Sequence, residues 1–162
     1  MISNSAEETI KIGSRLAKRL KAGDVVALVG ELGSGKTVFT KGIAKGLGVK
    51  NARYVNSPTF VIIKEYKAKV PLYHFDLYRL DSPSGLDSLG WDEYFYGKGV
   101  TVIEWADKAK KLLPKKHVEV RLTVTGENVR RIVIARARSA RSNLKKGLLR
   151  FARNDDRKSD EI

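Results

Sequence analysis

The chain has 162 residues and no cysteine, which excludes disulfide bridges and thiolate metal sites. Lysine and arginine outnumber the acidic residues by 32 to 18, a net charge of +14 that favours a polyanionic partner or else reflects general solubility and a basic C-terminal segment. No apolar run approaches the about 20 residues that a membrane span needs, and the acidic N-terminal segment is not typical of a signal peptide. We therefore expect one folded, cytoplasmic domain.

The first third of the chain predicts a helix, a buried strand and a second helix. Ser5 and Glu8 have the spacing of a capping box, so a helix is expected to begin after Ser5 and to end by Gly23. Residues 24–29, DVVALV, form a short apolar run rich in β-branched side chains, which is typical of a strand covered on both faces. A glycine-rich stretch follows directly, and residues 36–48 predict the second helix.

The remaining elements are mostly strands. Residues 67–69 connect two strands as a hairpin, and residues 81–99 are turn-rich with one or two short helices expected. In 117–124 the residues Val118, Val120, Leu122 and Val124 alternate with polar ones, and the chain then turns back as a second hairpin. The predicted strands are 56–66 (after an initial turn), 70–80, 100–105, 117–124 and 129–136.

The glycine-rich stretch at residues 30–37, GELGSGKT, matches the phosphate-binding pattern G-x-x-x-x-G-K-[ST]. Glycines let successive main-chain N–H groups point inward, and the helix that follows adds its positive dipole end. In this pattern Lys36 reaches the β- and γ-phosphates, and the Thr37 hydroxyl ligates Mg²⁺. The alternative is a plain glycine-rich turn. The expected nucleotide-binding residues here are Gly30, Glu31, Gly33, Ser34, Gly35, Lys36, Thr37 and Val38.

These elements together predict an α/β fold: a P-loop NTPase-like mixed sheet flanked by helices, with a C-terminal β-hairpin. We expect the folded domain to span residues 1–136. Residues 137–162 are charged with few apolar side chains, and they predict a basic, flexible tail.

Two acidic residues on apolar strands are candidates for the chemistry of hydrolysis. Glu104 ends the run VTVIE, and Asp76 lies in YHFDLYR. Either carboxylate could hold Mg²⁺ through its water shell or position an attacking water molecule. The alternative for each is a structural role, such as a salt bridge at the rim of the sheet.

Three other residues have two open interpretations each. Thr59 in SPTF could sense a γ-phosphate from a loop, or it could simply enter a strand after a turn. His74 faces the same side of its strand as Asp76, and it could be catalytic or a core histidine. Arg79 could act as an arginine finger, although pairing with Asp76 or Asp81 is the better expectation.

Four segments in this order resemble one family. GELGSGKTVFTKGIAKGLGV, SPTFVIIKEY, YHFDLYRL and VIEWADK are similar to the TsaE (YjeE) family, the P-loop ATPases of bacterial tRNA threonylcarbamoyladenosine biosynthesis. The similarity runs from about Glu7 to Arg136. It implies a small ATPase that binds ATP and Mg²⁺ and joins the subunits TsaD and TsaB, so that it contacts tRNA only indirectly. TsaD transfers the threonylcarbamoyl group, and hydrolysis by the ATPase supports turnover.

The resemblance also assigns roles to individual residues. It implies that Lys36 and Thr37 are the phosphate lysine and metal threonine, that Glu104 is a metal ligand, and that Asp76 is needed for activity. It further implies that residues 57–59 form a switch segment, that Trp105 lies beside the metal acid, and that Arg130 or Arg131 reaches the nucleotide. The assigned catalytic residues are Lys36, Asp76, Glu104 and Thr59, and the assigned metal ligands are Thr37 and Glu104.

This sequence departs from the family pattern at two positions, Glu31 and Val38, where the family commonly has Asp and Thr. Glu31 keeps the charge, whereas Val38 loses a hydroxyl and with it a secondary phosphate contact. Three other functions compete with the ATPase: a GTP-dependent switch, a small-molecule kinase and a nucleic-acid-binding module. The guanine-reading Asn-Lys-x-Asp motif is absent from the chain, which disfavours the first of them.

Overall fold

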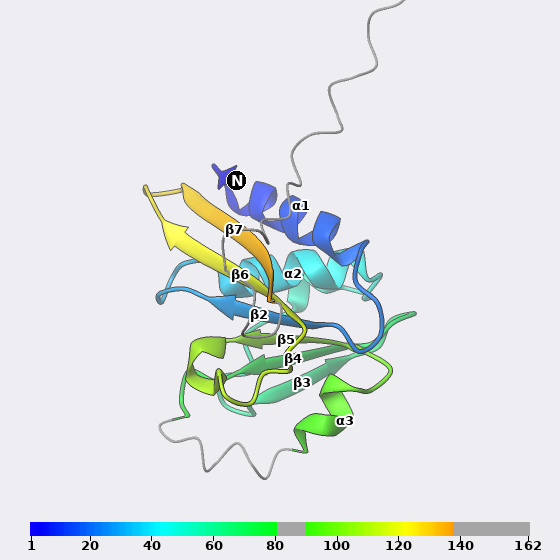
Figure 1. The fold of residues 1–162 in the computed structure, drawn as a ribbon. Coiled ribbons are helices and arrows are strands. Elements are labelled where there is room, and N and C mark those ends of the chain that lie inside the picture. Colours follow the sequence, from blue (N-terminus) through cyan, green and yellow to red (C-terminus); the bar gives the residue numbers. More distant parts are fainter. Residues whose placement is uncertain (81–89, 138–162) are drawn as a thin grey trace, which may run out of the picture.

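The computed structural model describes residues 1–80 and 90–137, which fold around one central sheet (Figure 1). Within these residues the sheet has seven strands in the order β1-β7-β6-β2-β5-β4-β3. The strands are β1 (Ile2–Ser3), β2 (Val25–Val29), β3 (Ile63–Tyr66), β4 (Leu72–Asp76), β5 (Val100–Glu104), β6 (His117–Val124) and β7 (Arg130–Ala137). The helical elements are α1 (Ala6–Ala17), α2 (Lys36–Gly46), α3 (Trp91–Phe95), and the 3₁₀ turns η1 (Ala52–Tyr54) and η4 (Ala106–Ala109).

The sheet is mixed, with a parallel centre. β2 pairs in parallel with β5 on one side and with β6 on the other, and β4 pairs in parallel with β5. β3, β7 and β1 add to this centre in antiparallel fashion, and β6 and β7 form the C-terminal hairpin. The predicted α/β fold with a mixed sheet and a C-terminal hairpin is therefore confirmed. Because β2, β4 and β5 run in the same direction, their C-terminal ends meet at one edge of the sheet.

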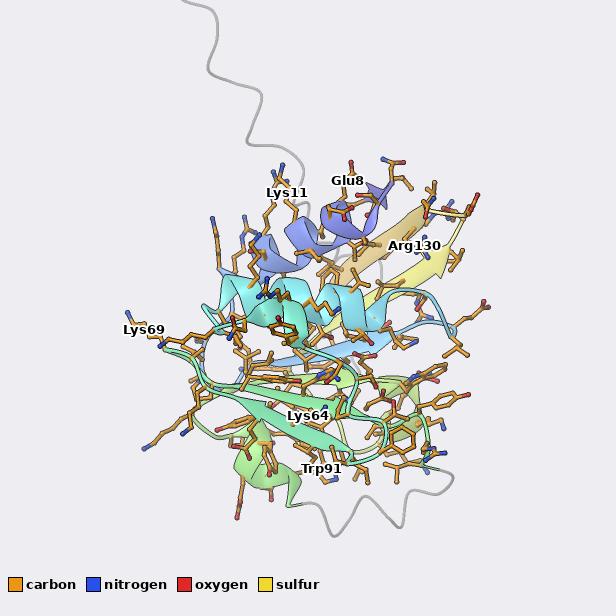
Figure 2. The ribbon with its side chains drawn as sticks, turned by 180° about the vertical axis from the view of Figure 1, so that it is seen from behind. Glu8, Lys11, Lys64, Lys69, Trp91 and Arg130 are labelled. Atoms are coloured by element: carbon orange, nitrogen blue, oxygen red, sulfur yellow. The ribbon has the colours of Figure 1, made fainter. Side chains whose placement is uncertain are left out.

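Helical elements cover both faces of the sheet, as the apolar run in β2 predicts. Val26 and Leu28 pack with residues of α1 and α2, whereas Val25 and Ala27 pack with residues of α3 and η4. Alternate side chains of a strand point to opposite faces, so a strand buried on both faces must be apolar at consecutive positions. Figure 2 shows the helices on the two faces: Trp91 of α3 and Glu8 of α1 lie on opposite sides of the sheet.

Helices α1 and α2 approach each other closely because glycines line their contact. A Cβ atom added to Gly42 would lie 2.3 Å from the Ile10 carbonyl oxygen, and one added to Gly13 would lie 2.5 Å from the carbonyl oxygen of Phe39. Side chains at these positions would force the helices apart. The position of α2 depends on this contact, and α2 carries Lys36 and Thr37 at its N-terminus.

The described elements differ from the predicted ones mainly at their ends. Ser5 is the N-cap of α1, as predicted, and accepts a hydrogen bond from the main-chain N–H of Glu8. β1 was not predicted, since two residues carry no periodicity. β3 begins only at Ile63, because the N–H groups of Val61 and Ile62 both bond to the Pro58 carbonyl and close a turn. Of the predicted tail, 137–162, Ala137 is instead the last residue of β7. Residues 138–162 and 81–89 lie outside the described residues.

Candidate functional site

A pocket of about 400 Å³ lies at the C-terminal ends of β2, β4 and β5. Crevices at this end of the strands are where open α/β sheets bind ligands. The lining residues are Leu32, Gly33, Gly35, Lys36, Thr37, Val38, Ser57, Thr59, Asp76, Tyr78, Glu104 and Trp105. The structure thus brings together most of the residues that the sequence singles out. Gly30, Glu31 and Ser34 belong to the same loop without lining the pocket.

The loop between β2 and α2 (residues 30–35, the phosphate loop) has the glycine-dependent shape expected of a phosphate cradle. A Cβ atom at Gly30 would lie 2.4 Å from the Leu122 carbonyl oxygen, so the tight turn out of β2 admits only glycine. Gly35 is the N-cap of α2 with φ of +97°, and no side chain caps this helix end. The first N–H groups of α2 therefore have no side-chain partner at the cap, which makes them available for an anion.

The Lys36 side chain lies across this loop. Its Nζ donates hydrogen bonds to the carbonyl oxygens of Gly30 and Glu31, each at 2.8 Å, and lies 3.8 Å from the centre of the Trp105 ring. Burial lowers the pKa of Lys36, and the negative charges of Glu104 and Asp76 partly offset that effect. A lysine held this way is a buried cation beside a cradle of N–H groups, which is the electrostatic environment that a phosphate requires.

Thr37 and Glu104 meet at the floor of the pocket. Thr37 Oγ1 donates to Oε2 of Glu104 at 3.0 Å, and the Glu104 side chain is almost fully buried. The other oxygen, Oε1, lies 2.8 Å from Nε2 of His74 and 3.4 Å from Oγ1 of Thr40. The sheet register explains this meeting, because Glu104 pairs with Leu28, the second-last residue of β2, and with Asp76 of β4 on its other side.

The oxygen atoms of Thr37 and Glu104 suit Mg²⁺. This ion binds through one or two carboxylates together with substrate phosphates and water, and seldom in an all-protein cage. In residues 1–80 and 90–137 no cluster of three or more His, Cys, Asp or Glu side chains could hold a metal by itself. The donor set therefore fits a metal that arrives with a nucleotide.

Asp76 is tied to the segment that contains Thr59. Its Oδ2 accepts hydrogen bonds from the Ser57 hydroxyl and from Thr59 Oγ1, the latter at 3.0 Å, and its Oδ1 accepts from the main-chain N–H of Tyr78 at 2.8 Å. Ile62, three residues after Thr59, has φ of +65°, which is unusual for a β-branched residue. Segment 57–62 is thus a sharply bent turn whose polar side is bonded to the strand-end carboxylate.

The structure places three arginines whose positions the sequence left open. Arg130 donates to the carbonyl oxygens of Glu127 at 2.9 Å and of Gly33 at 3.4 Å, so it lies beside the phosphate loop (Figure 2). Arg131, the other candidate, is opposite Thr123 and Ile2 in the sheet.

Arg79 does not pair with Asp76 in the described part of the chain: its guanidinium lies 4.6 Å from the centre of the Phe60 ring. Asp81, the other predicted partner, lies outside the described residues.

Several residues contribute to the site without a local pattern in the sequence that identifies them. Thr40 and Tyr78 were not predicted, and the packing of Trp105 against Lys36 was not foreseen. Trp105 has φ of +58° because the chain turns sharply from β5 into η4, and its ring centre lies 5.1 Å from that of Tyr78. One signal was available: Tyr78 lies two residues after Asp76, inside the predicted strand 70–80, although β4 itself ends at Asp76.

No helix in residues 1–80 or 90–137 is both long enough and apolar enough to cross a bilayer.

The comparisons with known proteins agree on one family. The family model described as threonylcarbamoyl adenosine biosynthesis protein TsaE matches residues 3–133.

Individual relatives also match over most of the chain. The tRNA threonylcarbamoyladenosine biosynthesis protein TsaE of Bacillus subtilis (strain 168) is 49% identical over 127 residues, which cover 78% of each chain. The protein of the same name from Treponema pallidum (strain Nichols) is 40% identical over 134 residues, 83% of this chain and 98% of the relative.

A solved structure supports the same assignment. The crystal structure of Bacillus subtilis YdiB superposes with a TM-score of 0.70 at 39% identity, covering 85% of this chain and 84% of that one. The segment that the family model matches contains the phosphate loop, the turn at 57–62 and the strand ends that carry Asp76 and Glu104. The resemblance predicted from the four motifs is thus confirmed, and the chain belongs to the TsaE family.

Proposed function

We propose that this protein is the ATP-binding and ATP-hydrolysing accessory subunit of the complex that makes N6-threonylcarbamoyladenosine at position 37 of tRNA (t6A37). Relatives that are 36% to 49% identical to this chain over the aligned residues are named for this biosynthesis. The observation that carries the ATPase part is the 3.0 Å contact between Thr37 and Glu104 beside the buried Lys36. Because tRNA is the substrate of the pathway, we place the protein in the cytoplasm.

The phosphate loop would hold the triphosphate of ATP by main-chain N–H groups of residues 30–38 and by Lys36. In the structure the Lys36 ammonium bonds to the loop carbonyls of Gly30 and Glu31, and phosphate oxygens would replace one or both of them as acceptors. Arg130 would add a second positive charge from the side of Gly33. These contacts neutralise the charge of the triphosphate and orient it along the N-terminus of α2.

Thr37 and Glu104 would hold Mg²⁺, which when bound neutralises the charge that develops on the β- and γ-phosphates. Glu104 acts from the end of β5, and its hydrogen bond to the Thr37 hydroxyl would be exchanged for metal coordination. Asp76 would position the attacking water molecule, and Thr59, which bonds to Asp76, would report the presence of the γ-phosphate to segment 57–62.

The rim of the pocket supports a role for partner subunits, TsaD and TsaB. Leu32 of the phosphate loop is 73% exposed, and Phe60 and Val61 of the turn are 83% and 60% exposed. Apolar side chains gathered around a polar site are typical of a surface that another protein covers. We expect slow hydrolysis by the isolated chain and stimulation when TsaD and TsaB complete the site; tRNA would be contacted only through that complex.

The test is a reconstitution of tRNA modification over many turnovers with TsaD, TsaB and this protein. Omission of the protein, or its replacement by Lys36→Ala, is expected to stop the reaction after the first turnovers. Competition between nucleotides separates the main alternative: tighter binding of GTP than of ATP would reject the ATPase in favour of a GTP-dependent switch. Sustained modification with Lys36→Ala would reject the proposed use of hydrolysis.

A further inference from the structure

The His74 side chain is completely buried. It comes from β4, two positions before Asp76, and lies next to the carboxylate of Glu104. Its Nε2 lies 2.8 Å from Oε1 of Glu104. The two residues are on adjacent parallel strands, β4 and β5, and His74 is opposite Val102 in the register, two positions before Glu104. A histidine in this position reaches the carboxylate from inside the protein, on the side away from Thr37.

The two oxygens of the Glu104 carboxylate therefore have different surroundings. Oε2 accepts from the Thr37 hydroxyl at 3.0 Å, whereas Oε1 faces His74 and Thr40. Thr40 has one hydroxyl hydrogen, and its shorter contact is the 3.0 Å bond to the Lys36 carbonyl, compared with 3.4 Å to Glu104. His74 is thus the principal donor to Oε1.

We propose that His74 is a positioning residue: it donates its Nε2–H to Oε1 of Glu104 and thereby holds Oε2 toward Thr37, where the metal would bind. This inference rests on the proposed function, because it concerns the metal-binding role of Glu104. A carboxylate free to rotate about its last bond presents its oxygens in many directions. A fixed donor on one oxygen restricts that rotation and orients the other oxygen before the metal arrives.

The same geometry assigns the tautomer of the His74 ring. A carboxylate oxygen accepts hydrogen bonds, so Nε2 must carry the hydrogen. Nδ1 of His74 is buried and has no hydrogen-bond partner within residues 1–80 and 90–137. A buried N–H donor without a partner is the more costly arrangement, which favours an unprotonated Nδ1. His117 provides the opposite case, because its Nδ1 lies 2.7 Å from the Pro114 carbonyl and must be the donor there.

The first test needs neither metal nor nucleotide. Long-range ¹H–¹⁵N NMR spectra of the full chain distinguish the two ring tautomers, and the chain contains only two histidines. We expect the Nε2–H form for His74 and the Nδ1–H form for His117, with a His117→Gln variant to assign the signals. An Nδ1–H ring at His74, which leaves Nε2 without a hydrogen to donate, would overturn the proposal.

The second test compares two amide side chains at the same buried position. The amide nitrogen of Gln can occupy the place of Nε2, whereas that of Asn lies near Nδ1, so only His74→Gln restores the donor to Glu104. Calorimetric titration with a non-hydrolysable ATP analogue at increasing Mg²⁺ gives the half-saturating Mg²⁺ concentration. We expect it to rise about tenfold or more in His74→Asn, and to stay near the wild-type value in His74→Gln.

The outcomes separate this inference from the function on which it rests. If the wild-type protein shows no Mg²⁺-dependent binding of the analogue, the proposed function fails. If the wild-type protein binds but both variants require the same Mg²⁺ as the wild type, the positioning role of His74 fails alone. An equal rise of the half-saturating Mg²⁺ concentration in both variants would also reject the positioning role. Such a result would indicate a general loss of packing, because only the Asn variant lacks the donor to Glu104.

Discussion

Thr37 and Glu104 are 67 positions apart in the chain, yet the Thr37 hydroxyl donates to the Glu104 carboxylate at 3.0 Å. The contact joins the first turn of α2 to the last residue of β5. Between them the chain passes through the hairpin of β3 and β4 and through α3 before it returns to the sheet beside β2. Parallel pairing of β2 with β5 is what brings the hydroxyl and the carboxylate to the same edge.

Replacement of Lys36 should remove nucleotide binding. Lys36→Ala deletes a buried ammonium whose charge-assisted hydrogen bonds contribute about 1.5–3 kcal/mol each, which corresponds to roughly a 10- to 150-fold loss of ATP affinity per bond. Fluorescence titration with a labelled ATP analogue would measure this. The exposed residue Lys45 in the same helix supplies the control, and Lys45→Ala should bind like the wild type. Equal affinity of Lys36→Ala and wild type would contradict the assigned loop.

Replacement of Glu104 should separate nucleotide binding from metal-dependent hydrolysis. Glu104→Ala removes the carboxylate beside Thr37, so we expect hydrolysis to fall at least about 100-fold, a change of roughly 2.7 kcal/mol in the barrier. Binding measured in EDTA should change much less, because the loop N–H groups and Lys36 remain. A colorimetric phosphate assay with and without Mg²⁺ checks the first point. Hydrolysis at the wild-type rate would count against Glu104 as the metal acid.

Arg130 and Arg131 form a matched pair for mutation. Arg130 contacts the Gly33 carbonyl, whereas Arg131 lies opposite Thr123 and Ile2. Arg130→Ala is expected to weaken ATP affinity about tenfold through the loss of one charged contact to the phosphates. Arg131→Ala should leave the affinity unchanged. The reverse order in a calorimetric titration would mean that the other arginine reaches the nucleotide.

The exposed phenyl ring of Phe60 should matter for partners and not for ATP itself. Phe60→Ser is expected to reduce the stimulation of hydrolysis by TsaD and TsaB several-fold, because it removes apolar surface at the rim of the pocket. Tyr96 is similarly exposed, at 72%, but follows α3 at the other end of the strands, and Tyr96→Ser is the control. Equal stimulation of both variants would argue against a partner at this rim.

The glycine contact between α1 and α2 should control stability. Gly42→Ala places a Cβ atom 2.3 Å from the Ile10 carbonyl oxygen, and this main-chain atom cannot move without shifting α1. Overpacking of this kind costs about 1–3 kcal/mol in the free energy of unfolding. Urea denaturation followed by circular dichroism would measure it, with Lys45→Ala as an exposed control in α2. A Gly42→Ala protein as stable as the wild type would show that the helices can separate at little cost.

The sequence by itself determined the features that local chemistry specifies. The loop at 30–37 needs its glycines and its lysine within eight consecutive positions. The cap at Ser5, the apolar run of β2 and the alternation in β6 likewise depend on residues only a few positions apart, where steric and hydrogen-bonding preferences act directly. Fold class and family could be predicted for the same reason.

Only the tertiary structure decided which distant side chains meet. His74 and Glu104 are 30 positions apart, and their contact depends on the register of β4 against β5. Arg130, and not Arg131, lies beside the loop. The reason is that neighbouring residues of β7 face opposite sides of the sheet. Strand order and register are set by the packing of the whole sheet, so no local pattern in the sequence contains them.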